Sequence, residues 1–181
     1  QADDLIAAVE AGEAAFGTID ILVNNAGIPD AQWAHKMTVA AIDQVLGTNL
    51  RGPWILSCEV ARRLIAAGRG GNIVNISSVA HYQYTGGAAA LYATTKTAVA
   101  RMTEALAMEW SPYRINVNAI APGMVTSEMT DGMFARMGGN PAPHLPRKRV
   151  VETAQLDSTL RYLVSPASEC VPGAVIRVDD G

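Results

Sequence analysis

Gly71-Asn72-Ile73-Val74-Asn75-Ile76-Ser77-Ser78 is the stretch that decides the fold of this chain. It has the length and apolar character of a buried strand, and it ends in two hydroxyl side chains. Two other stretches have the same form. Asp20-Ile21-Leu22-Val23-Asn24-Asn25-Ala26-Gly27 breaks at Asn-Asn-Ala-Gly, and Arg114-Ile115-Asn116-Val117-Asn118-Ala119-Ile120-Ala121-Pro122-Gly123 ends in a Pro-Gly turn. The three stretches predict three buried strands.

Helical patterns alternate with these strands. Helices are predicted over 3–16, from about 39 after the capping residue Thr38, over 53–67, over 92–110, as a short lid over 127–137 and near 151–164. Strands are predicted over 19–24, 72–77, 114–119 and around 174–178. Helices between buried apolar strands indicate βα units, so we expect an α/β fold with a parallel sheet.

Length, charge and cysteine content narrow the class of protein. A chain of 181 residues suits a single domain covering 1–181. A net charge of −3 offers no footprint for nucleic acid or an anionic membrane. No long apolar run and no charged-then-apolar leader is present, so we expect a cytoplasmic protein. Cys58 and Cys170 form no motif, which favours buried or incidental thiols over a disulfide or metal pair.

The ends of the predicted strands indicate where a ligand would bind. Ligands of open parallel sheets lie at the carboxyl ends of the strands, so Gly27, Ser78 and Gly123 should gather near one crevice. Tyr92 opens the next helix, and Lys96 lies about one turn later on the same face. A nearby ammonium would lower the pKa of Tyr92 from about 10 and make the phenol a usable general acid or base.

At these positions the chain resembles the short-chain dehydrogenase/reductase family, particularly its 3-oxoacyl-reductase-like members. The matching motifs are Asn24-Asn25-Ala26-Gly27, Asn49 within Thr48-Asn49-Leu50, Ser78, Tyr92-x-x-x-Lys96 and Pro122-Gly123-Met124-Val125. The resemblance implies a Rossmann-like, doubly wound parallel sheet. It also implies an oxidoreductase that interconverts a ketone and a secondary alcohol with NAD or NADP.

The resemblance assigns a role to each matching residue. Tyr92 would exchange the proton with the substrate oxygen, and Lys96 would lower the Tyr92 pKa and hold the nicotinamide ribose. Ser78, rather than Ser77, would hydrogen-bond the substrate oxygen. Asn49 would hold a water that links Lys96 to solvent. Taken singly, these residues have simpler readings: Asn49 could cap or kink a helix, and the serines could merely end a strand.

The cofactor contacts implied by the resemblance follow the strand ends. Asn25, Ala26 and Gly27 would line the adenosine-side ribose, and Tyr92 and Lys96 would border the nicotinamide ribose. Pro122, Gly123 and Val125 would border the nicotinamide, and Ser127 would add a hydroxyl. Helices 53–67 and 92–110 bear long apolar faces, which in this family form a homodimer interface that recurs in homotetramers. No metal site is indicated.

One departure from the family pattern lies at the front of the chain. The T-G-x-x-x-G-x-G motif that holds the cofactor pyrophosphate is absent, and the first glycines are Gly12 and Gly17. We therefore expect 1–181 to be the C-terminal part of a Rossmann-type domain, with an unprotected apolar edge strand at 19–24. Two alternatives stay open: a non-catalytic subunit or interaction module, and a lyase or isomerase that needs no hydride donor.

Overall fold

The computed structural model describes residues 2–84 and 86–181, without the side chains of Arg136 and Met137, so Gln1 of the predicted domain lies outside the described residues. The strands are β1 (Ile21–Asn24), β2 (Gly71–Ile76), β3 (Ile115–Pro122) and β4 (Val175–Val178). The α-helices are α1 (Ala2–Phe16), α2 (Val39–Leu46), α3 (Gly52–Ala66), α4 (Ala90–Trp110), α5 (Glu128–Met137) and α6 (Asp157–Val164).

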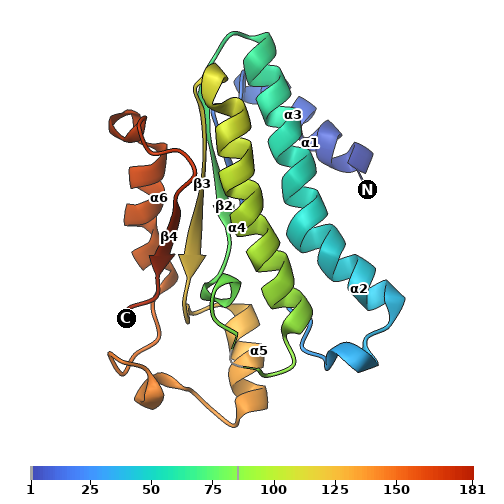
Figure 1. Ribbon diagram of the computed structural model, residues 1–181, viewed down its shortest axis with the longest axis vertical. Helices are drawn as coiled ribbons and strands as arrows, with labels where there is room; N and C mark the ends of the chain where they lie inside the picture. The colour runs from blue at the N-terminus through green and yellow to red at the C-terminus, as the bar shows by residue number, and fades with distance from the viewer. Residues whose placement is uncertain (1, 85) are drawn as a thin grey trace.

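The four strands form one parallel sheet in the order β1-β2-β3-β4. Helices α3 and α4 cover one face and α6 covers the other, while α1 packs against α3 (Figure 1). Helix α5 lies beyond the arrowheads of β3 and β4, at the carboxyl end of the sheet (Figure 1). The structure therefore confirms the predicted α/β class and the parallel sheet.

The core divides into two clusters because strand side chains alternate between the faces of the sheet. Ile73 packs with Leu64 of α3 and Met102 of α4 in the larger cluster. The next residue, Val74, points to the opposite face and packs with Leu163 of α6 in the smaller one. Burial of these side chains fixes the register of β2, since a shift by one residue would turn each of them to the wrong face.

Two predicted helices are joined in the structure. Helix α2 begins after Thr38, whose hydroxyl accepts from the N–H of Ala41 and confirms the predicted cap. Helix α2 then passes into α3 through a π-helical turn over Gly47–Arg51 that contains Asn49. The two helices predicted before and after Asn49 are therefore continuous in the structure, with one widened turn between them, which is a feature often found at functional sites.

Other boundaries also differ from the prediction. Helix α4 begins at Ala90, two residues before the predicted start at Tyr92. Strand β1 begins two residues late, and α6 begins at Asp157 because the residues before it, Thr153–Leu156, form a 3₁₀ turn. Strand β3 continues to Pro122, which lies opposite Val178 of β4. The Pro-Gly pair therefore ends the strand three residues later than expected.

Strand β1 is an edge of the described sheet, as the sequence predicts. Ile21 and Val23 are 46% and 38% exposed. Beside them, the buried Oδ1 of Asn24 has no hydrogen-bond partner among the described residues. No described helix is both long enough and apolar enough to span a bilayer.

Candidate functional site

Helix α4 brings Tyr92 and Lys96 together behind the carboxyl end of β2. The Nζ atom of Lys96 lies 5.6 Å from the centre of the Tyr92 ring. The same ammonium donates a 2.8 Å hydrogen bond to the carbonyl of Ile76, the last residue of β2. Lys96 is only 4% exposed, so it is anchored between the helix and the sheet rather than free in solvent.

Burial controls the pKa of both side chains. The pKa of Lys96 falls from its ordinary value of 10.5 to about 8, because the packed interior disfavours the charged ammonium. Burial also raises the pKa of Tyr92, and a hydrogen bond with the Ser78 side chain opposes this only in part. The expected lowering of the Tyr92 pKa by Lys96 is therefore wrong for this structure: desolvation is the largest cause.

The two serines after β2 point to different partners. The hydroxyl of Ser77 is buried and donates a 2.9 Å hydrogen bond to the backbone carbonyl of Lys96. The hydroxyl of Ser78 accepts from the N–H of Ala80, and it lies near enough to the Tyr92 phenol to lower the pKa of that phenol in part. Ser78 is therefore the serine whose hydroxyl acts on the phenol, whereas Ser77 fastens α4 to the sheet.

Asn49 joins the widened helical turn to the loop after β1. Its Oδ1 accepts from the N–H of Ile28 at 2.8 Å, and its Nδ2 donates to the carbonyl of Ile28 at 2.9 Å. The same Nδ2 donates to the hydroxyl of Thr95 at 3.3 Å, which in turn donates to the carbonyl of Tyr92 at 2.7 Å. Asn49 thus connects the loop to the helix that carries Tyr92 and Lys96.

Gly27 lies where a larger residue would be obstructed. A Cβ atom at this position would lie 3.3 Å from Nζ of Lys96 and 3.7 Å from Oδ1 of Asn49. Glycine therefore lets the loop approach both polar side chains closely. The preceding Asn25 and Ala26 are exposed, so the structure leaves their surfaces open beside the buried cluster.

The residues after β3 lie at the same end of the sheet. Gly123 packs so closely that a Cβ atom would come within 2.6 Å of the Asp179 Cβ atom. Val125 is buried and pairs with Val151 in a short parallel bridge. Ser127 is the N-cap of α5 and accepts from the N–H of Thr130, so its hydroxyl already has a structural role.

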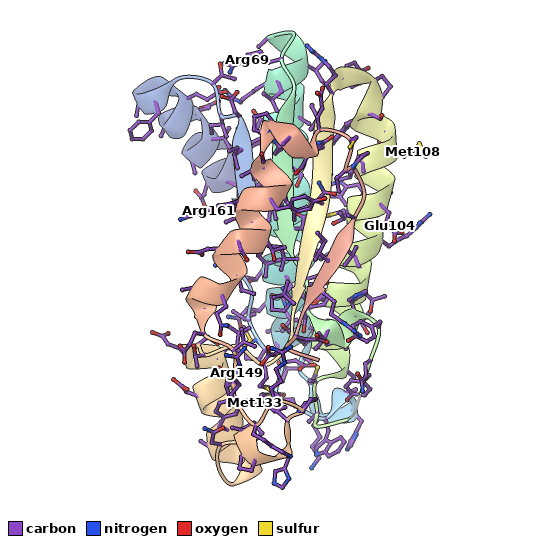
Figure 2. The ribbon with its side chains drawn as sticks, turned by 90° about the vertical axis from the view of Figure 1, so that its left-hand side faces the viewer. Arg69, Glu104, Met108, Met133, Arg149 and Arg161 are labelled. Atoms are coloured by element: carbon purple, nitrogen blue, oxygen red, sulfur yellow. The ribbon has the colours of Figure 1, made fainter. Side chains whose placement is uncertain are left out.

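Two arginines that follow helix α5 in the sequence form ion pairs with Asp180. Figure 2 shows Arg149 and Met133 near one end of the molecule and Arg69 at the other. Arg149 binds Asp180 through two hydrogen bonds of 2.6 and 2.9 Å, and Arg147 reaches the same carboxylate at 3.3 Å. These two arginines therefore neutralise the strand-end carboxylate.

Three residues of the cluster were not predicted from the sequence. Ser77 donates to the backbone carbonyl of Lys96 and Thr95 to that of Tyr92, and Asp30 accepts hydrogen bonds from the first turn of α4. Adjacency to Ser78 and Lys96 is a signal that could have revealed the first two. No local pattern marks Asp30, because its partners lie about 60 positions away in the sequence.

A nicotinamide cofactor fits the polar groups of this cluster in part. Of the three N–H bonds of Lys96, one is directed to Ile76, its hydrogen-bond partner within the described part of the chain. The other two N–H bonds can donate to ribose hydroxyls, and Gly27 leaves the space beside them open. The glycine motif that binds a pyrophosphate is absent from the 181 residues. The residues present therefore fit the nicotinamide-ribose part of the cofactor.

Known proteins match this chain over its whole length. A family model described as enoyl-(acyl carrier protein) reductase matches residues 1–181. A 2-dehydro-3-deoxy-D-gluconate 5-dehydrogenase of Dickeya dadantii is 37% identical over 177 residues, which cover 97% of this chain and 70% of the relative. A 3-oxoacyl-(acyl-carrier-protein) reductase of Staphylococcus aureus is 32% identical, over 99% of this chain and 72% of the relative.

Solved structures agree in fold and in cofactor. A gluconate 5-dehydrogenase from Burkholderia cenocepacia, in complex with NADP and tartrate, superposes with a TM-score of 0.92 at 32% identity, over 100% of this chain and 71% of its own. Another structural relative holds NADH. These likenesses confirm the Rossmann-like fold and the expected cofactor class. The chain belongs to the short-chain dehydrogenase/reductase family of NAD- or NADP-dependent oxidoreductases.

Proposed function

We propose that this chain interconverts a ketone and a secondary alcohol, with Tyr92 as the general acid and base. The observation that supports this most is the grouping of three side chains. The Ser78 side chain acts on the Tyr92 phenol, whose pKa it lowers in part, and the Lys96 ammonium lies 5.6 Å from the phenol ring. A phenol and a hydroxyl that converge in this way can donate two hydrogen bonds to one carbonyl oxygen.

The protonation states suit reduction at neutral pH. Because burial raises the Tyr92 pKa, the phenol keeps its proton and can transfer it to the substrate oxygen as negative charge develops there. In the reverse direction the phenolate takes the hydroxyl proton. Ser78 holds the substrate oxygen against Tyr92 in both directions. NAD or NADP, when bound, donates or accepts the hydride.

Lys96 and Asn49 assist Tyr92 without donating a proton to the substrate themselves. With a pKa of about 8, Lys96 is mostly protonated at pH 7 and can hold the ribose hydroxyls while it stays fixed to Ile76. Both protons of the Asn49 amide are used by Ile28 and Thr95. A relay water at Asn49 would therefore use the second lone pair of Oδ1.

The remaining cofactor contacts follow the ends of the strands. Asn25, Ala26 and Gly27 would line the adenosine-side ribose. Pro122, Gly123 and the Val125 backbone would border the nicotinamide, and Ser127 would contribute while it caps α5. We place residues 1–181 as the C-terminal part of a Rossmann-type domain, with the exposed edge of β1 on the side of the pyrophosphate-binding units.

A second copy of the chain would cover an apolar hollow on the helical face. The hollow is lined chiefly by apolar side chains from α1, from the joined helix α2–α3 and from α4; these include Ile6, Leu50, Trp54, Ile55, Met102 and Ala105. Trp54 is 46% exposed there. Burying such a surface between two copies would remove apolar area from water, so a homodimer or a homotetramer is the expected assembly.

Cofactor titration tests the proposal directly. NADH and NADPH fluorescence would be titrated against the wild type, Lys96→Met and the control Lys36→Met, which changes an exposed lysine. We expect saturable binding of one cofactor, weakened at least about tenfold by Lys96→Met and unchanged by the control. Binding of neither cofactor would favour a non-catalytic subunit or a lyase or isomerase instead.

Turnover would then be measured with the two carbonyl classes that the relatives' names suggest. A 2-dehydro-3-deoxy-gluconate represents the sugar-acid class, and a 3-oxoacyl thioester represents the acyl class. We expect oxidation of the reduced cofactor with one of them. Cofactor binding without turnover of either would leave the oxidoreductase assignment standing and exclude these two substrates.

A further inference from the structure

Asp30 is a buried carboxylate that lies against the first turn of the helix carrying Tyr92. The residue as a whole is 7% exposed. Oδ2 accepts hydrogen bonds from the backbone N–H of Leu91 at 2.9 Å and of Tyr92 at 3.2 Å. Oδ1 accepts from the N–H of Ala31 at 2.8 Å. Both oxygens are therefore engaged, and one of them holds Tyr92 by its own backbone.

Helix α4 has no cap of its own at this end. The residue at its N-cap position, Ala89, makes no side-chain hydrogen bond, so the first N–H groups of the helix need acceptors from elsewhere. Asp30 supplies them from a loop 61 residues earlier in the chain. A carboxylate is well suited to this position because the N-terminus of a helix carries partial positive charge.

The loop that carries Asp30 is fixed at a second point. Asn49 binds both the N–H and the carbonyl of Ile28, two residues before Asp30. The next residue, Ala31, has a φ of 46°, a left-handed conformation that is costly for alanine and that the bond to Asp30 helps to hold. The loop is thus held at Ile28 by the joined helix and at Asp30 by α4.

We propose that Asp30 is a positioning residue, which fixes the start of α4, and with it the Tyr92 phenol, relative to the Gly27 loop. The inference rests on the proposed function of Tyr92. Asp30 does not touch the reacting atoms in this account. Its effect is geometric, and small misplacements of a reacting group can reduce the rate by as much as about a hundredfold.

The test compares Asp30→Ala, Asp30→Asn and Thr38→Ala. Asparagine keeps an oxygen that can accept from Leu91 or Tyr92, and it is as good a cap as aspartate in general. Thr38→Ala removes a side-chain cap at the start of a different helix, α2. It therefore reports what the loss of a cap does by itself to the stability of the fold.

The kinetic readout is kcat at saturating cofactor, together with the cofactor KM. For Asp30→Ala we expect kcat to fall at least about tenfold while KM changes less than about threefold, since Ile28 is still held by Asn49. Asp30→Asn should recover most of kcat, and Thr38→Ala should leave it unchanged. A kcat for Asp30→Ala within about twofold of the wild type would overturn the proposal.

A second readout does not depend on activity. Hydrogen exchange of the peptide containing Leu91 and Tyr92 should be at least about tenfold faster in Asp30→Ala and unchanged in Thr38→Ala. The titration of Tyr92, followed as the difference spectrum against Tyr92→Phe, should move toward its ordinary value as the phenol gains contact with water. If the wild type bound neither cofactor, the proposed function would fail; unaltered exchange and titration would refute the role of Asp30 separately.

Discussion

Replacing Lys96 by methionine should stabilise the fold while it weakens cofactor binding. Lys96 is buried, and burial lowers its pKa from 10.5 to about 8. This lowering means that keeping the buried ammonium charged at pH 7 costs the folded state about 3 kcal/mol. Methionine also loses the hydrogen bond to the Ile76 carbonyl, which costs about 1 kcal/mol. The net expectation is that Lys96→Met raises the free energy of unfolding by about 2 kcal/mol at pH 7.

The sign of the pH dependence follows from the two pKa values. The unfolded chain keeps the lysine proton up to a pH of about 10.5, whereas the folded chain releases it near pH 8. Between these values the unfolded state binds more protons, so wild-type stability rises with pH. From pH 7 to pH 9.5 this gain is about 2 kcal/mol. The advantage of Lys96→Met should therefore shrink to nearly zero at pH 9.5.

Urea denaturation of the wild type and of Lys96→Met at pH 7 and pH 9.5 measures how the difference between their free energies of unfolding changes with pH. Other titrating groups cancel, because both proteins contain them. Lys36→Met serves as the control, since Lys36 is exposed and its replacement removes no buried charge. A difference for Lys96→Met that is constant from pH 7 to pH 9.5 would refute the reasoning from burial.

Three further changes test the framework of the site by direct measurement. Asn49→Ala leaves the N–H and the carbonyl of Ile28 without their partner, so urea denaturation should show that the free energy of unfolding falls by about 2 kcal/mol. A fall below about 0.5 kcal/mol would contradict the structural role of the two Asn49–Ile28 hydrogen bonds. Gly71→Ala places a Cβ atom 2.6 Å from Leu64 Cδ1 and 2.8 Å from the Asp20 carbonyl oxygen. The free energy of unfolding should therefore fall by about 2 kcal/mol in the same assay. An unchanged urea midpoint would show that the strand can move aside. Trp54→Glu puts a charge in the apolar hollow, and light scattering should then give the monomer mass of 19.1 kDa; a mass equal to that of the wild-type oligomer would place the interface elsewhere.

The sheet could be predicted because each strand has a recognisable pattern in its own short stretch of sequence. Ile73 and Val74 lie in an apolar run closed by serines, and this pattern needs only burial on both faces to be correct. The grouping of Gly27, Ser78 and Tyr92 followed in turn, since parallel strands bring their carboxyl ends to one edge. Fold class and the placement of the motifs thus depend on short-range pattern and topology.

Other features depend on contacts that spacing does not reveal. The π-helical turn at Asn49 is held by bonds to Ile28, 21 residues earlier, so local patterns predicted two separate helices instead of one joined helix. The Tyr92 pKa was predicted to fall because Lys96 lies one turn away, but packing around both side chains raises it. Asp30 was not predicted at all, because the helix that it caps begins about 60 residues later.

The most direct test of the central claim is single-turnover oxidation of bound reduced cofactor by a carbonyl substrate, in Tyr92→Phe against Tyr113→Phe. Tyr113 is an exposed tyrosine beyond the far end of α4 and serves as the matched control. If Tyr92 supplies the proton, Tyr92→Phe should slow the step by at least about a hundredfold while cofactor binding is retained, and Tyr113→Phe should match the wild type. A Tyr92→Phe rate equal to that of the wild type would contradict the account.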